Sequence, residues 1–327
     1  METITSPLES KTDVYVQDAS RHAHEKDYLA LSIPGMENAQ TIETIDVKEM
    51  TTVRFRTEFI NNNKPCVIKG AVNHWPAIEK WRDKQYWLNT VTDKRVTVAR
   101  NNGHELSEKT KIGQIKMSFH EAMTRLYDEV DHTFYIQEVL PEAFTDIAGF
   151  HFLPAPSRSK NYVPNRLLIQ RRSFTTWHAH FVDEFLLCQV NGAKRVMLFS
   201  PNIPQEMGHV WHFLRQELYL EGQSLDKNLD FKPIVADLAE GDALYIPPYW
   251  HHAVHPLHSG INFSVVHCWG SPIHKFGKFS NYFVKQLYGS KLWPVNKYTP
   301  VMPFLAMGSL ASYTFKKMAG KISDQYI

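Results

Sequence analysis

Short apolar runs, separated by turn-forming residues, follow one another through the second half of the chain. Turn signals recur at Asn191-Gly192, at Glu240-Gly241-Asp242 and at Ser259-Gly260. Many short strands with regular turns are typical of a closed or sandwiched β-architecture. We therefore predict strands in the segments NRLLIQRRS, TTWHAHFVDEFLLCQVNG, AKRVMLFSP, PIVADLAEG, DALYIPPYWHHAVHPL and INFSVVHCWG.

The first half of the chain alternates between helical and β patterns. Residues 46–62 have the spacing of a helix, and Ser118 is placed to cap a second helix within 116–130. Short strands are expected in 65–72 and 132–139. The first helix should be buried on two sides, with Met50, Val53 and Ile60 near one face and Phe55 and Phe59 on the other. Together the patterns predict one β-barrel with helices at both ends.

Composition and charge exclude several classes of protein. The 327 residues are 43% hydrophobic and 21% charged, and the net charge of +2 is too small to indicate nucleic acid or an anionic membrane as partner. The polar N-terminus lacks the apolar core of a signal peptide, and prolines interrupt the longest uncharged run, so we expect neither secretion nor a membrane span. Cys66, Cys188 and Cys268 are widely spaced, which predicts free thiols and a cytoplasmic location.

Histidine is the unusual residue of this chain. On a strand, side chains two residues apart share a face, so His178 and His180 can bind one metal ion from one side. Only one of the adjacent His251 and His252 can supply a third ligand, and His255 shares a face with His251. An isolated pair of histidines at this spacing is more often packed than metal-bound. The second histidine cluster makes a metal site and a packed pair equally favoured interpretations. The chain has 17 histidines, with clusters at 178–180, 209–212 and 251–258.

Three segments, in the correct order, resemble one known family. They are NNNKPCVIKGAVNHWPAIEKW, FTTWHAHFVDEFLLCQVNGAKRVMLFSP and AEGDALYIPPYWHHAVHPL. Each is similar to a segment of the JmjC/cupin-like family of Fe(II)- and 2-oxoglutarate-dependent hydroxylases. The resemblance extends over residues 45–270 and implies a mainly β fold with flanking helices, a double-stranded β-helix of the jelly-roll or cupin type.

The resemblance also implies roles for particular residues. The first metal ligand of the family falls on His178 and the distal ligand on His252. Lys194 resembles the lysine that pairs with the distal carboxylate of the co-substrate, and Thr175 and Tyr135 match residues that help to hold that carboxylate. The implied cofactors are Fe(II), O₂ and 2-oxoglutarate.

The sequence departs from the family at the second ligand. His180 stands where the family has a carboxylate, and three neutral imidazoles leave the charge of a divalent ion uncompensated by protein. The spacing to Gln189 is one residue longer than in the family, which predicts a β-bulge in this strand. Glu184 would share the face of the two histidines in a regular strand, and a bulge could instead turn Asp183 inward. A solvent-facing Glu184 is the slightly favoured alternative.

Several other polar residues have both a functional and a structural interpretation. One of Arg171 and Arg172 could bind an anionic substrate, although an exposed pair is the default. His267 is expected to be a packed histidine and Asp242 to fix a hairpin. Side chains that could line the site are Trp177, Phe181, Asn262 and Ser264, whereas His209 and His212 are not expected to be ligands.

Three functions remain open from the sequence. The leading hypothesis is a mononuclear Fe(II) and 2-oxoglutarate-dependent oxygenase that hydroxylates a C–H bond through His178, His180 and His252. The second is a three-histidine iron or copper oxygenase that uses no 2-oxo acid and acts on a metal-chelating small molecule. The third is a non-catalytic cupin-like metal-binding protein.

The sequence also leads to expectations about partners and domains. A small-molecule or amino-acid-derived substrate is favoured over a macromolecule, with no membrane and no strong nucleic-acid signal. We divide the chain into an N-terminal arm (1–45), a catalytic domain (46–272) and a helical C-terminal region (273–327). The last region resembles the tail by which some relatives dimerise, so a homodimer is expected.

Overall fold

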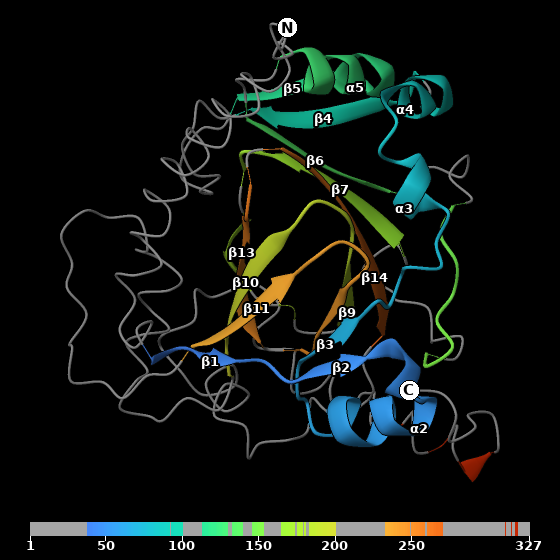
Figure 1. The fold of residues 1–327 in the computed structure, drawn as a ribbon, viewed down its shortest axis with the longest axis vertical. Coiled ribbons are helices and arrows are strands. Elements are labelled where there is room, and N and C mark those ends of the chain that lie inside the picture. Colours follow the sequence, from blue (N-terminus) through green and yellow to red (C-terminus); the bar gives the residue numbers. More distant parts are fainter. Residues whose placement is uncertain are drawn as a thin grey trace, which may run out of the picture.

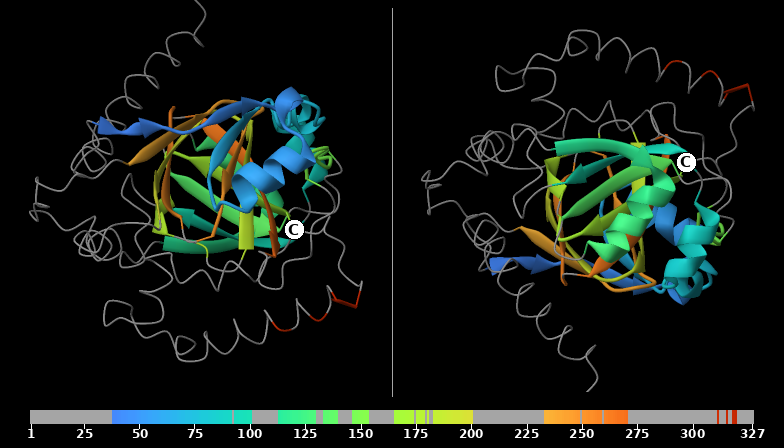
Figure 2. Two further views of the ribbon diagram at one scale, coloured as in Figure 1. Left: turned by 90° about the horizontal axis from the view of Figure 1, so that it is seen from below. Right: turned by 90° about the horizontal axis from the view of Figure 1, so that it is seen from above.

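The strands of this protein form two sheets that face each other and enclose a barrel (Figure 1, Figure 2). This confirms the predicted mainly β fold with flanking helices. No helix in the described part of the chain is both long and apolar enough to cross a membrane. The computed structural model describes residues 38–91, 93–100, 113–129, 133–139, 146–153, 165–173, 175–178, 180, 183–200, 233–248, 250–258 and 260–270, with 311, 315, 318 and 319. Most of the predicted C-terminal region, and with it the expected dimer contact, lies outside these residues.

Nearly all neighbouring strands in the two sheets are antiparallel. The exceptions are the short pairs β1 with β11 and β2 with β3, which are parallel. The smaller sheet has the described order β1 (Gln40–Thr41), β11 (Ile234–Leu238), β10 (Lys194–Phe199), β13 (His251–Pro256) and β8 (Thr175–His178). The larger has the order β2 (Thr44–Asp46), β3 (Cys66–Lys69), β12 (Ala243–Ile246), β9 (Asp183–Asn191), β14 (Ile261–Gly270), β7 (Asn165–Arg171), β6 (Phe134–Val139), β4 (Arg95–Arg100) and β5 (Gly113–Ser118).

Successive strands of the second half alternate between the two sheets. Asn191-Gly192 connects β9 of the larger sheet to β10 of the smaller, and residues 239–242 connect β11 back to β12. β13 and β14 again lie in different sheets. The predicted hairpin at Asp242 is therefore wrong, because this turn carries the chain between sheets. This crossing winds the chain around one closed interior, as expected for a jelly roll.

The segment around the first two histidines is not one strand. The sequence predicted a continuous strand from Thr175 to Gly192, but β8 ends at His178 in the smaller sheet and β9 begins at Asp183 in the larger. His180 lies in the connection between them. The register irregularities lie in the pairings of β8 with β13 and of β9 with β14.

Alternation along β9, β12 and β14 divides the apolar core into two layers. One face points into the barrel, and the opposite face packs beneath the N-terminal elements. The inward set includes Phe185, Leu187, Leu244, Val266 and Cys268. The outward set includes Leu186, Cys188, Tyr245, Val265 and Trp269.

Three helices from the first half cover the outward layer. They are α3 (Ala77–Lys80), α4 (Lys84–Thr90) and α5 (Phe119–Asp128), and Figure 1 shows the last two beside β4 and β5. Trp87 of α4 stacks on Phe263 of β14 with ring centroids 4.6 Å apart. The predicted cap of α5 is confirmed, since the Ser118 hydroxyl accepts the backbone N–H of Glu121 at 3.1 Å.

The predicted helix over residues 46–62 is broken into three pieces. A 3₁₀ turn η2 (Val47–Glu49) precedes the short helix α2 (Thr52–Arg54), which continues as the π-helical segment η3 (Phe55–Ile60). Phe55, Phe59 and Ile60 are buried as expected, but Val53 is 63% exposed. The wider π turn changes which side chains face the core, and a regular 3.6-residue period does not anticipate that shift.

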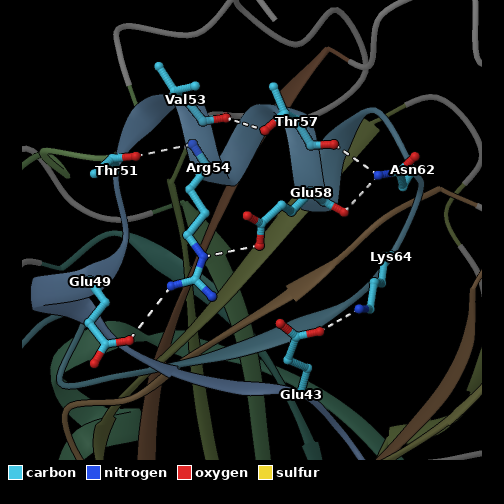
Figure 3. Close-up of polar contacts among 9 residues, drawn as sticks. All are labelled: Glu43, Glu49, Thr51, Val53, Arg54, Thr57, Glu58, Asn62 and Lys64. Atoms are coloured by element: carbon cyan, nitrogen blue, oxygen red, sulfur yellow. Dashed lines mark hydrogen bonds and ion pairs between the residues drawn. The ribbon is translucent and has the colours of Figure 1, made fainter.

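Polar contacts join the pieces of this broken helix to one another (Figure 3). Arg54 lies between Glu58, at 3.0 Å, and Glu49, at 3.6 Å. The amide of Asn62 donates to the carbonyls of Thr57 and Glu58, at 2.9 and 3.1 Å, and so satisfies groups that the helix end leaves open. These contacts fix the end of the segment that leads into β3.

Arg171 is a structural residue. Its side chain is 3% exposed, and its guanidinium donates to the backbone carbonyls of Leu126 and Glu129 at the C-terminal end of α5. The same group lies over the ring of Phe134, 5.2 Å from its centroid. A cation at a helix C-terminus satisfies open carbonyls and complements the helix dipole. Both sequence interpretations of Arg171, substrate clamp and exposed charge, are therefore wrong.

Asp242 joins the turn before β12 to the end of β3. Its carboxylate is bonded to the Lys69 ammonium at 2.6 Å and accepts the backbone N–H groups of Gly70, at 3.1 Å, and Ala239, at 2.9 Å. The neighbouring Gly241 has φ +90°, and a Cβ there would lie 1.8 Å from the Asn73 side chain. This junction is thus built around a buried carboxylate, as the structural interpretation of Asp242 required.

We expect Asp242→Ala to lower the free energy of unfolding by about 2–4 kcal/mol, because it leaves two backbone donors and one cation without their acceptor. Urea denaturation followed by circular dichroism measures this loss. Asp237→Ala is the control, since Asp237 pairs with Arg195 on the outside of the barrel, and we expect it to cost less than about 1 kcal/mol. Equal losses in the two variants would contradict the structural role of Asp242.

Candidate metal centre

Three histidines meet at one end of the barrel interior. His178 ends β8 and is the direct cross-strand partner of His252 on β13, so that their side chains share a face. His180 joins them from the connection after β8. One nitrogen from each of the three rings can be chosen so that all three atoms lie within 4.8 Å of one another. In the described part of the chain this is the group of His, Cys, Asp and Glu side chains with metal-binding geometry.

The rings are packed against each other and oriented by their surroundings. The ring centroid of His178 lies 4.2 Å from that of His252 and 4.9 Å from that of His180. Nδ1 of His252 donates to the backbone carbonyl of Trp250 at 3.0 Å. This hydrogen bond places the proton on Nδ1 and leaves the Nε2 lone pair available to a metal.

The protein favours the neutral form of these imidazoles. Burial is the main reason that the pKa of His180 lies well below its usual value, and the nearby His178 and His252 lower that pKa further. Burial, and then His178, likewise hold the pKa of His252 well below the usual value. Neutral imidazole is the form that ligates a metal. Proton competition for these two nitrogens is therefore weak at neutral pH.

Neither carboxylate considered from the sequence belongs to this group. Glu184 is 0% exposed, and it accepts a hydrogen bond from the Tyr245 hydroxyl at 2.6 Å in the layer outside the barrel. The predictions that Glu184 shares the histidine face or faces solvent are therefore both wrong, since β9 starts afresh at Asp183. Asp183 is 1% exposed at the start of that strand, and it also lies outside the three-residue group.

An aromatic residue missed by the sequence analysis packs directly on the centre. Phe185 stacks on His180 with ring centroids 3.6 Å apart and an interplanar angle of 19°. The guanidinium of Arg166 lies over the same Phe185 ring, 5.4 Å from its centroid. The signal available in the sequence was alternation, since Phe185, Leu187 and Gln189 occupy one face of β9. This signal was hidden because one continuous strand over residues 175–192 would place Phe185 on the face opposite the two histidines.

Lys194 is buried in the same interior. Its side chain is 1% exposed, and it lies on β10 on the face that it shares with Leu198, the cross-strand partner of His252. The Nζ group donates to the Ser264 hydroxyl at 2.7 Å, which in turn donates to the Gln189 side chain at 2.8 Å. Burial lowers the pKa of Lys194 to about 7. A lysine held by neutral groups in an apolar interior is a ready partner for an anion.

Thr175 and Tyr135 come together around a third residue, Gln170 of β7. The Gln170 amide donates to the Thr175 hydroxyl at 3.3 Å, and Tyr135 is the cross-strand partner of Gln170. The Tyr135 hydroxyl donates to Gln137 at 2.8 Å, and burial raises the pKa of Tyr135 to about 12. Gln170 is also the cross-strand partner of Asn262, whose side chain accepts from Gln189 at 3.2 Å. One polar band thus leads from Tyr135 and Thr175 toward the Lys194 network.

The other histidines named from the sequence do not belong to the cluster where the structure describes them. His252, and not its neighbour His251, joins the cluster. His267 lies on the outward face of β14, bonded through Nδ1 to Asn165 at 2.7 Å and packed beside Phe150 and Trp269. Burial lowers its pKa to about 4, so the prediction of a packed histidine is confirmed. His209, His212, Phe181 and the side chain of Trp177 lie outside the described residues.

Comparison with known proteins identifies relatives over most of the barrel. A family model described as a cupin-like domain matches residues 52–275. The chain is 24% identical to the fruit fly Jumonji C domain-containing protein 5, with 61% of this chain and 53% of the relative covered. It is also 24% identical to the human bifunctional peptidase and (3S)-lysyl hydroxylase JMJD7, with 63% and 78% covered. A third relative is the arginine-specific demethylase JMJ22 of Arabidopsis thaliana, 24% identical with 66% and 44% covered. The chain spans about half the length of the first curated relatives it matches.

We expect the protein to bind one divalent metal ion, and His180→Ala or His252→Ala to weaken that binding by on the order of 100-fold, since each removes a ligand. Competition with a chromogenic chelator measures the affinity for Fe(II) or Co(II). His255→Ala is the matched control, because His255 lies on the same strand as His252 but on its opposite face. A metal affinity that is unchanged in His180→Ala would exclude His180 as a ligand.

Proposed function

The chain belongs to the cupin-like domain family, and from this premise we propose that it is a mononuclear non-heme iron oxygenase that uses 2-oxoglutarate and O₂ to hydroxylate a C–H bond. One observation carries the proposal: three histidines with ligand atoms within 4.8 Å of one another share an interior with the buried Lys194. The relatives named for lysyl hydroxylation and arginine demethylation support oxygenase chemistry at the level of the family.

The residues present suit a divalent transition metal. Imidazole nitrogen is a common ligand for iron, copper and zinc, and three imidazoles leave coordination positions open. His178, His180 and His252 would hold the ion, and the Trp250 carbonyl orients His252 through Nδ1. Bound Fe(II) in this family supplies the activation of O₂ that is coupled to decarboxylation of the 2-oxo acid.

The remaining side chains would bind the co-substrate and exclude water. Lys194 would pair with the distal carboxylate of 2-oxoglutarate, and Thr175 and Tyr135 would complete the polar wall near it. Phe185 would hold the His180 ring in place and keep water from that side of the centre. Three neutral ligands leave the 2+ charge of iron for the co-substrate to balance, so the dianionic 2-oxoglutarate gives a neutral pair with the metal.

The alternative enzyme, a three-histidine oxygenase without a 2-oxo acid, has one observation in its favour. Within the described residues the histidine group includes no carboxylate. Lys194 argues against it, because burying a lysine without a bound anion costs stability and serves no evident purpose in that reaction. We also propose a cytoplasmic location and a small-molecule or amino-acid-derived substrate; the three cysteines are buried free thiols, as a reducing compartment requires.

Anaerobic reconstitution tests the proposal directly. Adding 2-oxoglutarate to the Fe(II)-loaded protein should produce a weak visible metal-to-ligand charge-transfer band, because the acid chelates the metal. The band should be lost in His180→Ala. His180→Asp, which returns a carboxylate ligand, is expected to retain it. A wild-type protein that binds iron but gives no band would favour the oxygenase without a 2-oxo acid.

Lys194→Met should separate stability from co-substrate binding. At pH 7 we expect this variant to gain about 1–3 kcal/mol in the free energy of unfolding, since it removes a poorly solvated amine. It should also lose measurable binding of 2-oxoglutarate. The folded-state pKa of about 7 lies below the unfolded value, so the cost of Lys194 grows as pH falls from 10.5 toward 7 and is complete below 7.

The same pKa sets the pH dependence of co-substrate affinity in the wild-type protein. A bound carboxylate raises the pKa of the Lys194 ammonium, so binding takes up a proton when the pH exceeds about 7. Affinity for 2-oxoglutarate should therefore fall as pH rises from 7 to 9. Calorimetry in two buffers with different ionisation enthalpies measures that proton uptake. A pH-independent affinity would contradict the role of Lys194.

A further inference from the structure

His258 joins two turns at the end of β10 through both nitrogens of its ring. The backbone N–H of Ala193 points at Nε2 and that of Gly260 points at Nδ1, each at 3.0 Å. The backbone N–H of Leu257 in turn donates to the Ala193 carbonyl at 2.9 Å. Ala193 immediately precedes Lys194, the first residue of β10. His258 therefore holds the end of the strand from which the buried lysine extends.

Hydrogen bonds through the barrel connect the same two residues a second time. The network of Lys194 includes Gln189, whose amide donates to the Asn262 side chain at 3.2 Å. Asn262 donates to the carbonyl of Gly260 at 3.3 Å, and the N–H of this glycine faces His258. The lysine and the histidine are thus linked both along the backbone and across the interior.

The turn before β10 approaches His258 closely. Gly192 has φ +83°, which favours glycine at this position. A Cβ on Gly192 would lie 2.7 Å from Nε2 of His258 and 2.4 Å from Oδ1 of Asn262. The histidine ring and the amide are therefore packed directly against the backbone of the turn that leads into β10.

Only a neutral ring can accept from the two backbone donors. A neutral imidazole has one acceptor nitrogen, so each of its tautomers serves one of the two N–H groups, whereas an imidazolium has donors alone. Protonation would set a ring N–H against each backbone N–H. Burial, and then the charge of Lys194, hold the pKa of His258 below its usual value. At neutral pH the ring is accordingly neutral and holds both turns together.

The other charged groups around His258 are balanced or face away. On the turn before β12, Glu240 accepts from the Asn191 amide at 3.3 Å and is paired with Arg82. On the strand that precedes the ring, His255 lies on the outer face of β13. From β14 the ring is faced by an uncharged amide. Its response to pH is therefore set by its own burial and by the buried ammonium of β10.

We propose that His258 is a positioning residue for Lys194: its neutral ring holds the end of β10 so that the ammonium meets the distal carboxylate of 2-oxoglutarate, and protonation of the ring releases this end and weakens co-substrate binding. This inference rests on the proposed function, because it concerns the same co-substrate. His258 acts through the backbone and touches no reacting group. A pure charge effect has the opposite sign, since an imidazolium near the lysine would attract the carboxylate.

Binding of 2-oxoglutarate to the anaerobic, Fe(II)-saturated protein, measured by calorimetry between pH 7 and pH 5, tests this role. The reference is His258→Gln, whose amide oxygen can accept from Ala193 and does not titrate. At pH 7 we expect His258→Gln to bind within about threefold of the wild type and His258→Leu to lose about tenfold, since leucine offers no acceptor. Toward pH 5 the wild-type affinity should fall at least about threefold relative to that of His258→Gln.

The controls separate positioning from a charge effect and from a general loss of structure. His255→Gln removes the neighbouring histidine and should follow the wild type at every pH. Metal affinity should be unchanged in His258→Leu, and a parallel loss of metal binding would overturn the proposal, because the ring would then support the centre itself. The same pH profile in wild type and His258→Gln overturns it, as does an affinity that rises in acid relative to that variant.

Nuclear magnetic resonance of the wild-type, Zn(II)-loaded protein tests the contacts without a variant or a co-substrate. The backbone N–H signals of Ala193, Lys194 and Gly260 should shift with the same midpoint as the His258 ring, below pH 6.5. Amide signals that do not follow the ring overturn the proposal. If they follow the ring but the protein does not bind 2-oxoglutarate, the co-substrate assignment fails and the positioning of Lys194 by His258 stands.

Discussion

The antiparallel pairing of β8 with β13 is the constraint on which the metal centre depends. These strands are far apart in the sequence, yet their register places His178 directly opposite His252. The pairing forms only because the chain crosses repeatedly between two sheets and closes around one interior. A shift of register by one residue would turn one of the two imidazoles to the outside of the barrel.

The barrel interior has an apolar part and a polar part. Apolar side chains from both sheets fill much of it, while polar groups gather around Lys194, Ser264 and Gln189. Such a network is costly in an apolar barrel unless each member is hydrogen-bonded or a ligand completes it. Burial disfavours the charged ammonium, and this lowers the pKa of Lys194. Binding of an anion would relieve it, which is why stability and co-substrate binding are expected to oppose each other here.

The surroundings of His180 bring little negative charge to the centre. Phe185, stacked on His180, supplies an apolar neighbour, and Arg166 supplies a positive one. Glu184 is bonded to Tyr245 outside the barrel, and Asp183 is not one of the residues of the histidine group. A centre with little negative charge of its own depends on its ligands for charge balance, and this favours an anionic co-substrate.

The sequence by itself determined the strand-rich barrel, the three histidines that meet, the Ser118 helix cap and the packed His267. These depend on side-chain periodicity, local hydrogen bonding and recognisable motifs, which act over a few residues. Only the tertiary structure decided that residues 175–192 divide into β8 and β9, that Glu184 faces outward and that Arg171 caps α5. It also decided that Phe185 and Arg166 adjoin the centre. The physical reason is that these outcomes depend on which sheet a strand joins and in what register, and long-range pairing fixes both.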